Sequence, residues 1–88
     1  MSGPYDVGIT ARAARDLDHL PEKIANACVE FIFSALADNP HRVGKPLRAE
    51  LSGSYSARRG DYRVVYAINE TRHLIAIEHI GRRSDIYR

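Results

Sequence analysis

The sequence predicts an α+β domain of two layers, in the order β-α-α-β-β-β, with an antiparallel helical hairpin packed on one face of a mostly antiparallel sheet. Two observations predict this class. Residues 5–39 contain one short alternating segment and then two segments with helical periodicity, whereas residues 54–80 contain three alternating segments separated by turns. With 88 residues, 44% hydrophobic and 27% charged, we expect one domain over residues 1–88 with a single core.

The first strand and the first helix meet at Thr10. Apolar side chains alternate over residues 5–9, which indicates a short strand. Thr10 is a good N-cap for a helix over ARAARDLDHL, because its hydroxyl can accept a hydrogen bond from the first turn. Ala13, Leu17 and Leu20 recur at spacings of four and three, so they form one apolar face of that helix.

A second helix is predicted to begin with Pro21 at its first position and to run to about Asn39, where Pro40 stops it. The apolar stripe of this helix consists of Ile24, Cys28, Phe31, Ile32, Ala35 and Leu36. The single cysteine, Cys28, is interpreted as a small buried residue of the stripe. Because the connection between the two helices is short, they should form an antiparallel hairpin.

Glycines and prolines interrupt the next segment, HRVGKPLRAELSG, and its apolar residues have no clear period. We interpret it as an ordered crossing loop whose Val43, Leu47 and Leu51 pack into the core.

Three strands are predicted over residues 54–59, 62–69 and 73–80, with Glu70-Thr71-Arg72 as a tight connection between the last two. Gly60-Asp61 is interpreted as a type II′ turn, because glycine can adopt the positive φ that the first turn position requires. The resulting register places Tyr55, Ala57, Val64, Tyr66 and Ile68 on the face toward the helices, and Ser56, Arg58, Arg63 and Val65 on the other face.

Arg58 and Arg63 are therefore expected to stand directly opposite each other, which is destabilising for like charges. Two adjacent guanidiniums on an uncovered face form a ready phosphate site. The charge asymmetry agrees with this: residues 1–40 carry three basic and six acidic side chains, and residues 41–88 carry ten basic and five acidic. The alternative is that both arginines extend into water, where salt screens their repulsion.

The composition also excludes several classes of function. No apolar run approaches the ~20 residues that cross a bilayer. We therefore expect a cytoplasmic protein that does not bind a membrane. One cysteine permits no internal disulfide, and the four scattered histidines do not have the spacing of a metal site.

The C-terminal residues GRRSDIYR extend the basic character and add a tyrosine, Tyr87. Arginines beside an aromatic ring suit RNA, because guanidiniums bind phosphates and the ring stacks on an unpaired base. The alternative for Tyr87 is that the ring anchors the end of the chain to the core.

The stretch GKPLRAELSGSYSARRGDYRVVYAI, followed by IGRRSDIYR, resembles the RelE toxins of bacterial toxin–antitoxin systems, within the RelE/ParE superfamily. The resemblance covers nearly the whole chain and implies a RelE-like fold. It further implies a ribosome-dependent endoribonuclease that cuts messenger RNA in the ribosomal A site. The nucleophile would be the 2′-hydroxyl of the RNA itself, and no metal or cofactor would take part.

The resemblance implies roles for particular residues. The catalytic set would be Arg58, Arg63, Arg83 and Tyr87, and the residues contacting RNA or the ribosome would be Lys45, Arg59, Arg82 and Arg88. Ser56 and Arg58 stand where some RelE toxins have lysines, and arginine is a poor general base. Tyr87 and His79 are the candidates for that role, with a packing histidine as the alternative for His79.

The resemblance also implies partners: the ribosome with its messenger RNA, and a RelB-like antitoxin that forms a hetero-oligomer with the toxin. The alternative function is that of the ParE branch of the superfamily, whose members inhibit DNA gyrase by binding it and are not nucleases.

Overall fold

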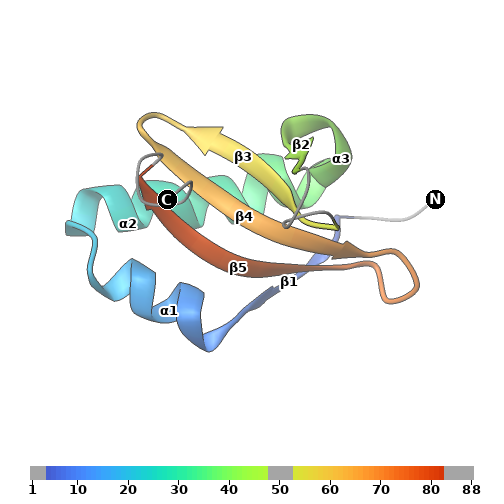
Figure 1. Cartoon of the computed structure of the whole chain (residues 1–88), viewed down its shortest axis with the longest axis horizontal. Coiled ribbons are helices and arrows are strands. Elements are labelled where there is room, and N and C mark those ends of the chain that lie inside the picture. Colours follow the sequence, from blue (N-terminus) through green and yellow to red (C-terminus); the bar gives the residue numbers. More distant parts are fainter. Residues whose placement is uncertain (1–3, 48–52, 83–88) are drawn as a thin grey trace.

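The computed structural model describes residues 4–47 and 53–82. In this part of the chain a five-stranded sheet has the order β1-β5-β4-β3-β2, with β1 parallel to β5 and the other neighbouring strands antiparallel. The elements are β1 Asp6–Ile9, α1 Ala11–Asp18, α2 Glu22–Phe31, the π-helical segment η1 Ile32–Leu36, α3 Pro40–Val43, β2 Lys45–Pro46, β3 Tyr55–Arg59, β4 Tyr62–Asn69 and β5 Leu74–Arg82. The predicted α+β class is confirmed, with α2 behind the sheet in the view of Figure 1.

Thr10 caps α1, as predicted. Its hydroxyl oxygen accepts a hydrogen bond from the backbone N–H of Ala13 at 3.2 Å, and the same hydroxyl donates to the carbonyl of Ile77 at 2.7 Å. The N-terminus of α1 is therefore tied to β5 at the point where the pairing of β1 with β5 ends, at Ile9 and Ile77.

The second helix begins at Glu22 and not at Pro21, which occupies the N-cap position one residue earlier. Helical backbone continues from α2 through η1, so the predicted length is close to the observed one. Ile32 and Leu36, one helical turn apart, are both fully buried against the sheet. No helix among residues 4–47 and 53–82 is long and apolar enough to cross a membrane.

The crossing segment is more regular than the sequence predicts, because it contains α3 and the short strand β2, which pairs antiparallel with β3. Val43 is 37% exposed, so its predicted place in the core is wrong. Pro40 is buried in its stead, and its carbonyl accepts a hydrogen bond from the Tyr66 hydroxyl at 2.5 Å. Leu47 is half-buried, so its predicted packing into the core is confirmed in part. Leu51 lies outside the described residues.

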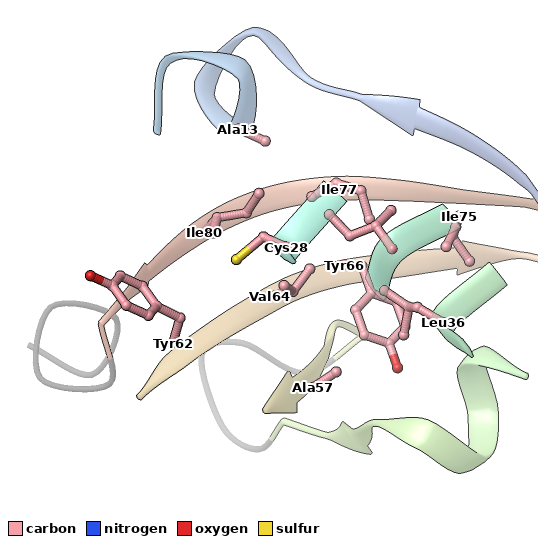
Figure 2. Packing of buried hydrophobic residues seen from close by; sticks show 11 residues of the cluster. Ala13, Cys28, Leu36, Ala57, Tyr62, Val64, Tyr66, Ile75, Ile77 and Ile80 are labelled. Atoms are coloured by element: carbon pink, nitrogen blue, oxygen red, sulfur yellow. The ribbon is translucent and has the colours of Figure 1, made fainter. Parts of the chain in front are cut away.

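The β3–β4 hairpin has the predicted register, with Arg58 opposite Arg63 and Arg59 opposite Tyr62. Gly60 has a φ of 62°, as a type II′ turn requires at its first position. Figure 2 shows the core-facing side chains of the hairpin and of β5 pointing toward the helical layer. The fully buried members from the sheet are Ala57, Val64, Tyr66, Ile75, Ile77 and Ile80.

Strand β5 begins one residue later than predicted, because His73 has a φ of 52° and belongs to the preceding turn. It also continues to Arg82, two residues beyond the predicted end. A bulge interrupts its pairing with β4, so that Val65 pairs with His79 but Tyr66 pairs with Ile77. The extra residue, Glu78, explains how Ile77 and Ile80 both face the core although they are three positions apart.

Candidate functional site

The face of the sheet opposite the helices carries a row of three residues at one end. Arg58 on β3 pairs with Arg63 on β4, and Arg63 pairs with Gly81 on β5, so their side-chain positions lie side by side across three strands. We call Arg58, Arg63 and Gly81 the arginine row. In Figure 1 this face is turned toward the viewer, and no described helix covers it.

The arginine row presents concentrated positive charge. The Arg58 side chain is exposed, and its Nε donates a hydrogen bond to the carbonyl of Gly60 at 3.3 Å, within the turn. That bond orients the guanidinium and leaves the two terminal nitrogens for an anion. Arg63 is half-buried between its neighbours on β3 and β5. Two guanidiniums in direct register can bind one phosphate from two sides.

Lys45 lies on the same face, and its contact with RNA stays a prediction. It pairs with Ser56, which is two positions from Arg58 along β3, and side chains two apart in a strand share a face. Ser56 and Val65 are only 7% and 6% exposed. Among the described residues, the arginines and lysines of this face are Lys45, Arg58 and Arg63.

Arg59 and Arg82 belong to the other face. Both pair with Tyr62, one from each side, and Tyr62 is part of the core. The guanidinium carbon of Arg82 lies 5.9 Å from the centroid of the Tyr62 ring, within cation–π range. Arg59 lines a hollow with Cys28 and Lys23 of α2. The fold thus divides the predicted basic residues between two faces that meet at the end of β4 and β5.

His79 is held by a carboxylate that the sequence did not single out. Its Nδ1 lies 2.6 Å from Oδ2 of Asp16 in α1, and the backbone N–H of Ile80 donates to the same oxygen at 3.0 Å. The His79 and Asp16 side chains are 18% and 23% exposed. This partly buried pair supports a packing role, and His79 lies two positions from Gly81. No sequence signal distinguishes Asp16 from Asp18, the other acidic residue of α1, because the contact depends on tertiary packing.

Three predicted site residues, Arg83, Tyr87 and Arg88, lie outside the described residues. That Arg83 and Tyr87 lie beside the arginine row therefore stays a prediction. Strand β5 carries the chain to Gly81 and Arg82, directly before this segment.

A second cluster of polar and aromatic residues lies at the opposite end of β4. Glu70 accepts a hydrogen bond from the Tyr5 hydroxyl at 2.7 Å and pairs with the imidazole of His41. The Tyr5 hydrogen bond, followed by that of His41, lowers the pKa of Glu70, and the same carboxylate raises the pKa of Tyr5. Tyr5 also stacks on His73. In the described part of the chain no three histidine, cysteine or acidic side chains are placed to hold a metal ion.

Comparison with known proteins identifies relatives along almost the whole chain. The family model of the ParE toxin of the type II toxin–antitoxin system parDE matches residues 7–87. The protein named Toxin RelE of Mycobacterium tuberculosis is 67% identical over 85 residues, which cover 97% of this chain and 88% of that protein. Toxin RelG of the same organism is 51% identical, with 97% and 98% covered.

Solved structures of related toxins have the same fold. The toxin–antitoxin complex RelBE2 of M. tuberculosis matches with a TM-score of 0.90 and 47% identity, over 97% of this chain and 98% of the matched chain. The free E. coli RelE toxin in a mutant form matches with a TM-score of 0.77 at 17% identity, which shows the fold alone. The chain belongs to the ParE toxin family of type II toxin–antitoxin systems, within the RelE/ParE superfamily.

Proposed function

We propose that this toxin is a ribosome-dependent endoribonuclease, which cuts messenger RNA in the ribosomal A site and so inhibits translation in the cytoplasm. The observation that carries the proposal is the direct pairing of Arg58 with Arg63 on a sheet face that no described helix covers. The 67% identity to a protein named Toxin RelE favours this function over gyrase inhibition.

The proposed reaction is a metal-independent transesterification. The 2′-oxygen of one ribose attacks the adjacent phosphorus, and the bond from phosphorus to the 5′-oxygen of the next nucleotide breaks. The upstream fragment then ends in a 2′,3′-cyclic phosphate and the downstream fragment in a 5′-hydroxyl. The 2′-hydroxyl loses one proton and the leaving oxygen gains one, so the reaction consumes no other reactant.

Arg58 and Arg63 would stabilise the extra negative charge that develops on the phosphate during attack. Removing one such donor typically costs about 10²–10³ in rate. A guanidinium group is a poor base, so neither arginine is assigned the role of general base. Tyr87 and Arg83 complete the proposed site, with Tyr87 as a proton-transfer residue whose phenolate nearby arginines would favour. His79 is the weaker candidate, because Asp16 already engages its Nδ1.

A RelB-like antitoxin would regulate the toxin by forming a hetero-oligomer with it. The solved structure that matches this chain at 47% identity is that of a toxin–antitoxin complex, which supports such a partner. The ribosome and its messenger RNA would be the partners of the free toxin, with Lys45 and Arg59 among the contacting residues.

Primer extension on translating ribosomes tests the proposed function. The wild type should produce discrete cuts within A-site codons, and Arg63→Ala should reduce them by about 10²-fold or more. Arg72→Ala is the matched control, because Arg72 is an exposed arginine at the opposite end of the sheet and should leave the cuts unchanged. Toxicity without cuts, together with impaired DNA supercoiling, would contradict the proposal and support the gyrase alternative.

A further inference from the structure

A carboxylate lies on the same face of the sheet as the arginine row. Ile77 is fully buried in the core, and side chains alternate along a strand, so Glu78 points to the face opposite the helices. Its Oε1 accepts a hydrogen bond from the Ser54 hydroxyl at 2.7 Å. The Ser54 carbonyl accepts a hydrogen bond from the Leu47 N–H at 2.8 Å, which continues the pairing of β2 with β3. Ser54 therefore shares a face with Arg58, four positions further along the same strand direction.

The hydrogen bond between Ser54 and Glu78 spans a strand. Because β4 lies between β3 and β5 in the sheet, the Glu78 side chain lies across β4. Ala67 of β4 and Ala76 of β5 are paired in register on the same face, next to this bond. Alanine side chains are too short to cover the carboxylate, and Glu78 is half-buried, so a ligand on this face can reach it.

The position of Glu78 is fixed from two sides. It is the extra residue of the bulge between β4 and β5, and bulges commonly re-aim a side chain beside a functional site. The Thr10 hydroxyl donates to the carbonyl of Ile77 at 2.7 Å and lies 3.5 Å from the carbonyl oxygen of Glu78. Ser54 holds the other end of the residue, at the carboxylate. A side chain that is already ordered loses little conformational entropy when it binds a ligand.

A carboxylate has a particular use on a face that binds RNA. It repels phosphate and only accepts hydrogen bonds, so it suits the N–H donors of a base edge. Guanine is the RNA base whose Watson–Crick edge presents two adjacent donors, N1–H and the N2 amino group, whereas the other bases place an acceptor beside their donor. The two oxygens of one carboxylate can therefore accept both guanine donors together. Oε1 retains a second lone pair for this besides its bond to Ser54.

The distance from the arginine row suits one nucleotide. Glu78 is three residues before Gly81, the β5 member of the row, which is roughly 10 Å at about 3.3 Å per residue. This is comparable with the length of a nucleotide from its phosphate to the far edge of its base. A phosphate at the arginine row therefore allows the base of a neighbouring, unpaired nucleotide to lie at Glu78.

We propose that Glu78, positioned by Ser54, is a guanine-binding subsite on the RNA-binding face. Both oxygens of its carboxylate accept hydrogen bonds from the Watson–Crick edge of the base. The inference rests on the proposed ribonuclease function for its role, because the guanine then belongs to the messenger RNA beside the cut bond. Binding of the base is measurable without cleavage.

Titration of the isotope-labelled chain with the 5′-monophosphates of guanosine, adenosine, cytidine and uridine, followed by NMR, tests the subsite. The four probes share ribose and phosphate, so differences in affinity come from the base. The guanosine nucleotide should bind at least about fivefold more tightly than each of the others and should shift the resonances of Ser54, Ala67 and Glu78. Equal affinities would overturn the proposal, and so would a guanine preference without shifts at these residues.

Glu78→Gln tests the carboxylate itself. The amide keeps an acceptor for the Ser54 hydroxyl but replaces one of the two acceptors for guanine by a donor. The guanine preference should disappear in favour of adenine or cytosine, because each of these places an acceptor beside a donor. Glu30→Gln is the matched control, because it removes the same charge from an exposed position on α2, in the helical layer. A guanine preference that persists in Glu78→Gln would overturn the proposal.

Ser54→Ala tests the positioning role of the hydroxyl. Without that hydrogen bond, the affinity for the guanosine nucleotide should fall about threefold and that for the adenosine nucleotide should not change. Ser54→Thr keeps a hydroxyl and should restore the preference. A bond that only stabilises the sheet would lower the midpoint of urea denaturation in Ser54→Ala without changing the ratio of the two affinities, and this result would overturn the proposed role of Ser54.

Primer extension on translating ribosomes separates this inference from the proposed function. Cuts by the wild type should be enriched beside guanine, and Glu78→Gln should remove the enrichment. Cuts with the same base profile in wild type and Glu78→Gln would overturn the subsite and leave the proposed function standing. Saturable binding of the guanosine nucleotide at Glu78 without ribosomal cuts would support the subsite and overturn the proposed function.

Discussion

Tyr66 determines the path of the crossing segment at the scale of single residues. Its side chain is fully buried, it stacks on Tyr55 with ring centroids 5.7 Å apart, and its hydroxyl donates to the Pro40 carbonyl. Gly44 lies so close that a Cβ there would be 2.0 Å from the Tyr66 hydroxyl oxygen and 3.0 Å from the Ser56 carbonyl oxygen. Only the absence of a side chain at Gly44 lets the chain reach β2 along this path.

Gly44→Ala should therefore lower the free energy of unfolding by about 1–3 kcal/mol, the usual cost of overpacking a core. The measurement is equilibrium denaturation in urea. Gly8→Ala is the matched control, because the nearest atom to a Cβ there is an ordinary 3.8 Å away, and it should change stability by less than about 0.5 kcal/mol. Equal effects of the two substitutions would contradict the steric argument.

Burial of Tyr66 also predicts a pH dependence. Desolvation, and to a lesser degree the neighbouring Tyr55, raises the pKa of Tyr66 from 10.0 to about 12. The folded state therefore keeps a proton that the unfolded chain loses, so this contribution to stability is complete below pH 10 and is lost as the pH rises toward 12. The difference in unfolding free energy between wild type and Tyr66→Phe should narrow across this window. A constant difference would contradict the prediction.

The β3–β4 hairpin was predictable at the scale of elements because local chemistry determines it. Gly60 fixes the turn, the turn fixes the register, and the register places Arg58 opposite Arg63. Thr10 was predictable as a cap for the same reason. By contrast, α3 and β2 depend on Tyr66, which is distant in sequence, and the bulge at Glu78 depends on packing of β5 against the core. Such long-range contacts leave no local pattern.

The candidate site shows the same division. The positions of the arginine row follow from the hairpin turn and strand alternation, whereas the Asp16–His79 pair forms only when α1 packs beside β5. The sequence also predicts that the arginines of the C-terminal half belong to one RNA-binding site. In the structure, Arg82 instead lies beside Tyr62 on the helix side of the sheet.

The arginine row should cost the hairpin stability, since like charges directly opposite in a strand pair repel. Arg58→Glu should therefore raise the free energy of unfolding by about 0.2–1 kcal/mol at low salt, and it should abolish ribosomal cuts. Arg59→Glu is the matched control, because Arg59 on the same strand faces Tyr62 and no opposed cation. Stability that falls in Arg58→Glu and not in Arg59→Glu would show that the pair is not repulsive.

The charge of the whole molecule is divided between its halves, with the excess of positive charge in residues 41–88, which include β2 to β5. The acidic excess lies in residues 1–40, which include β1 and the helices α1 and α2. The basic half of the chain contains most of the sheet and the acidic half contains α1 and α2, so the sheet strands β2 to β5 attract RNA more strongly than these helices do.

This division predicts where an antitoxin inhibits the toxin. A RelB-like partner that neutralises the toxin has to cover the basic face, because leaving Arg58, Arg63 and Lys45 open would leave phosphate binding intact. Hydrogen exchange of the purified complex should therefore be slower than that of the free toxin in peptides spanning residues 55–66. Peptides from the β4–β5 turn, around residues 70–73, serve as the internal control, because that turn lies at the opposite end of the sheet and should exchange equally in both states. Unchanged exchange over residues 55–66 in a complex that no longer cuts RNA would mean that the antitoxin acts from another surface, by changing the toxin's conformation and not by covering its site.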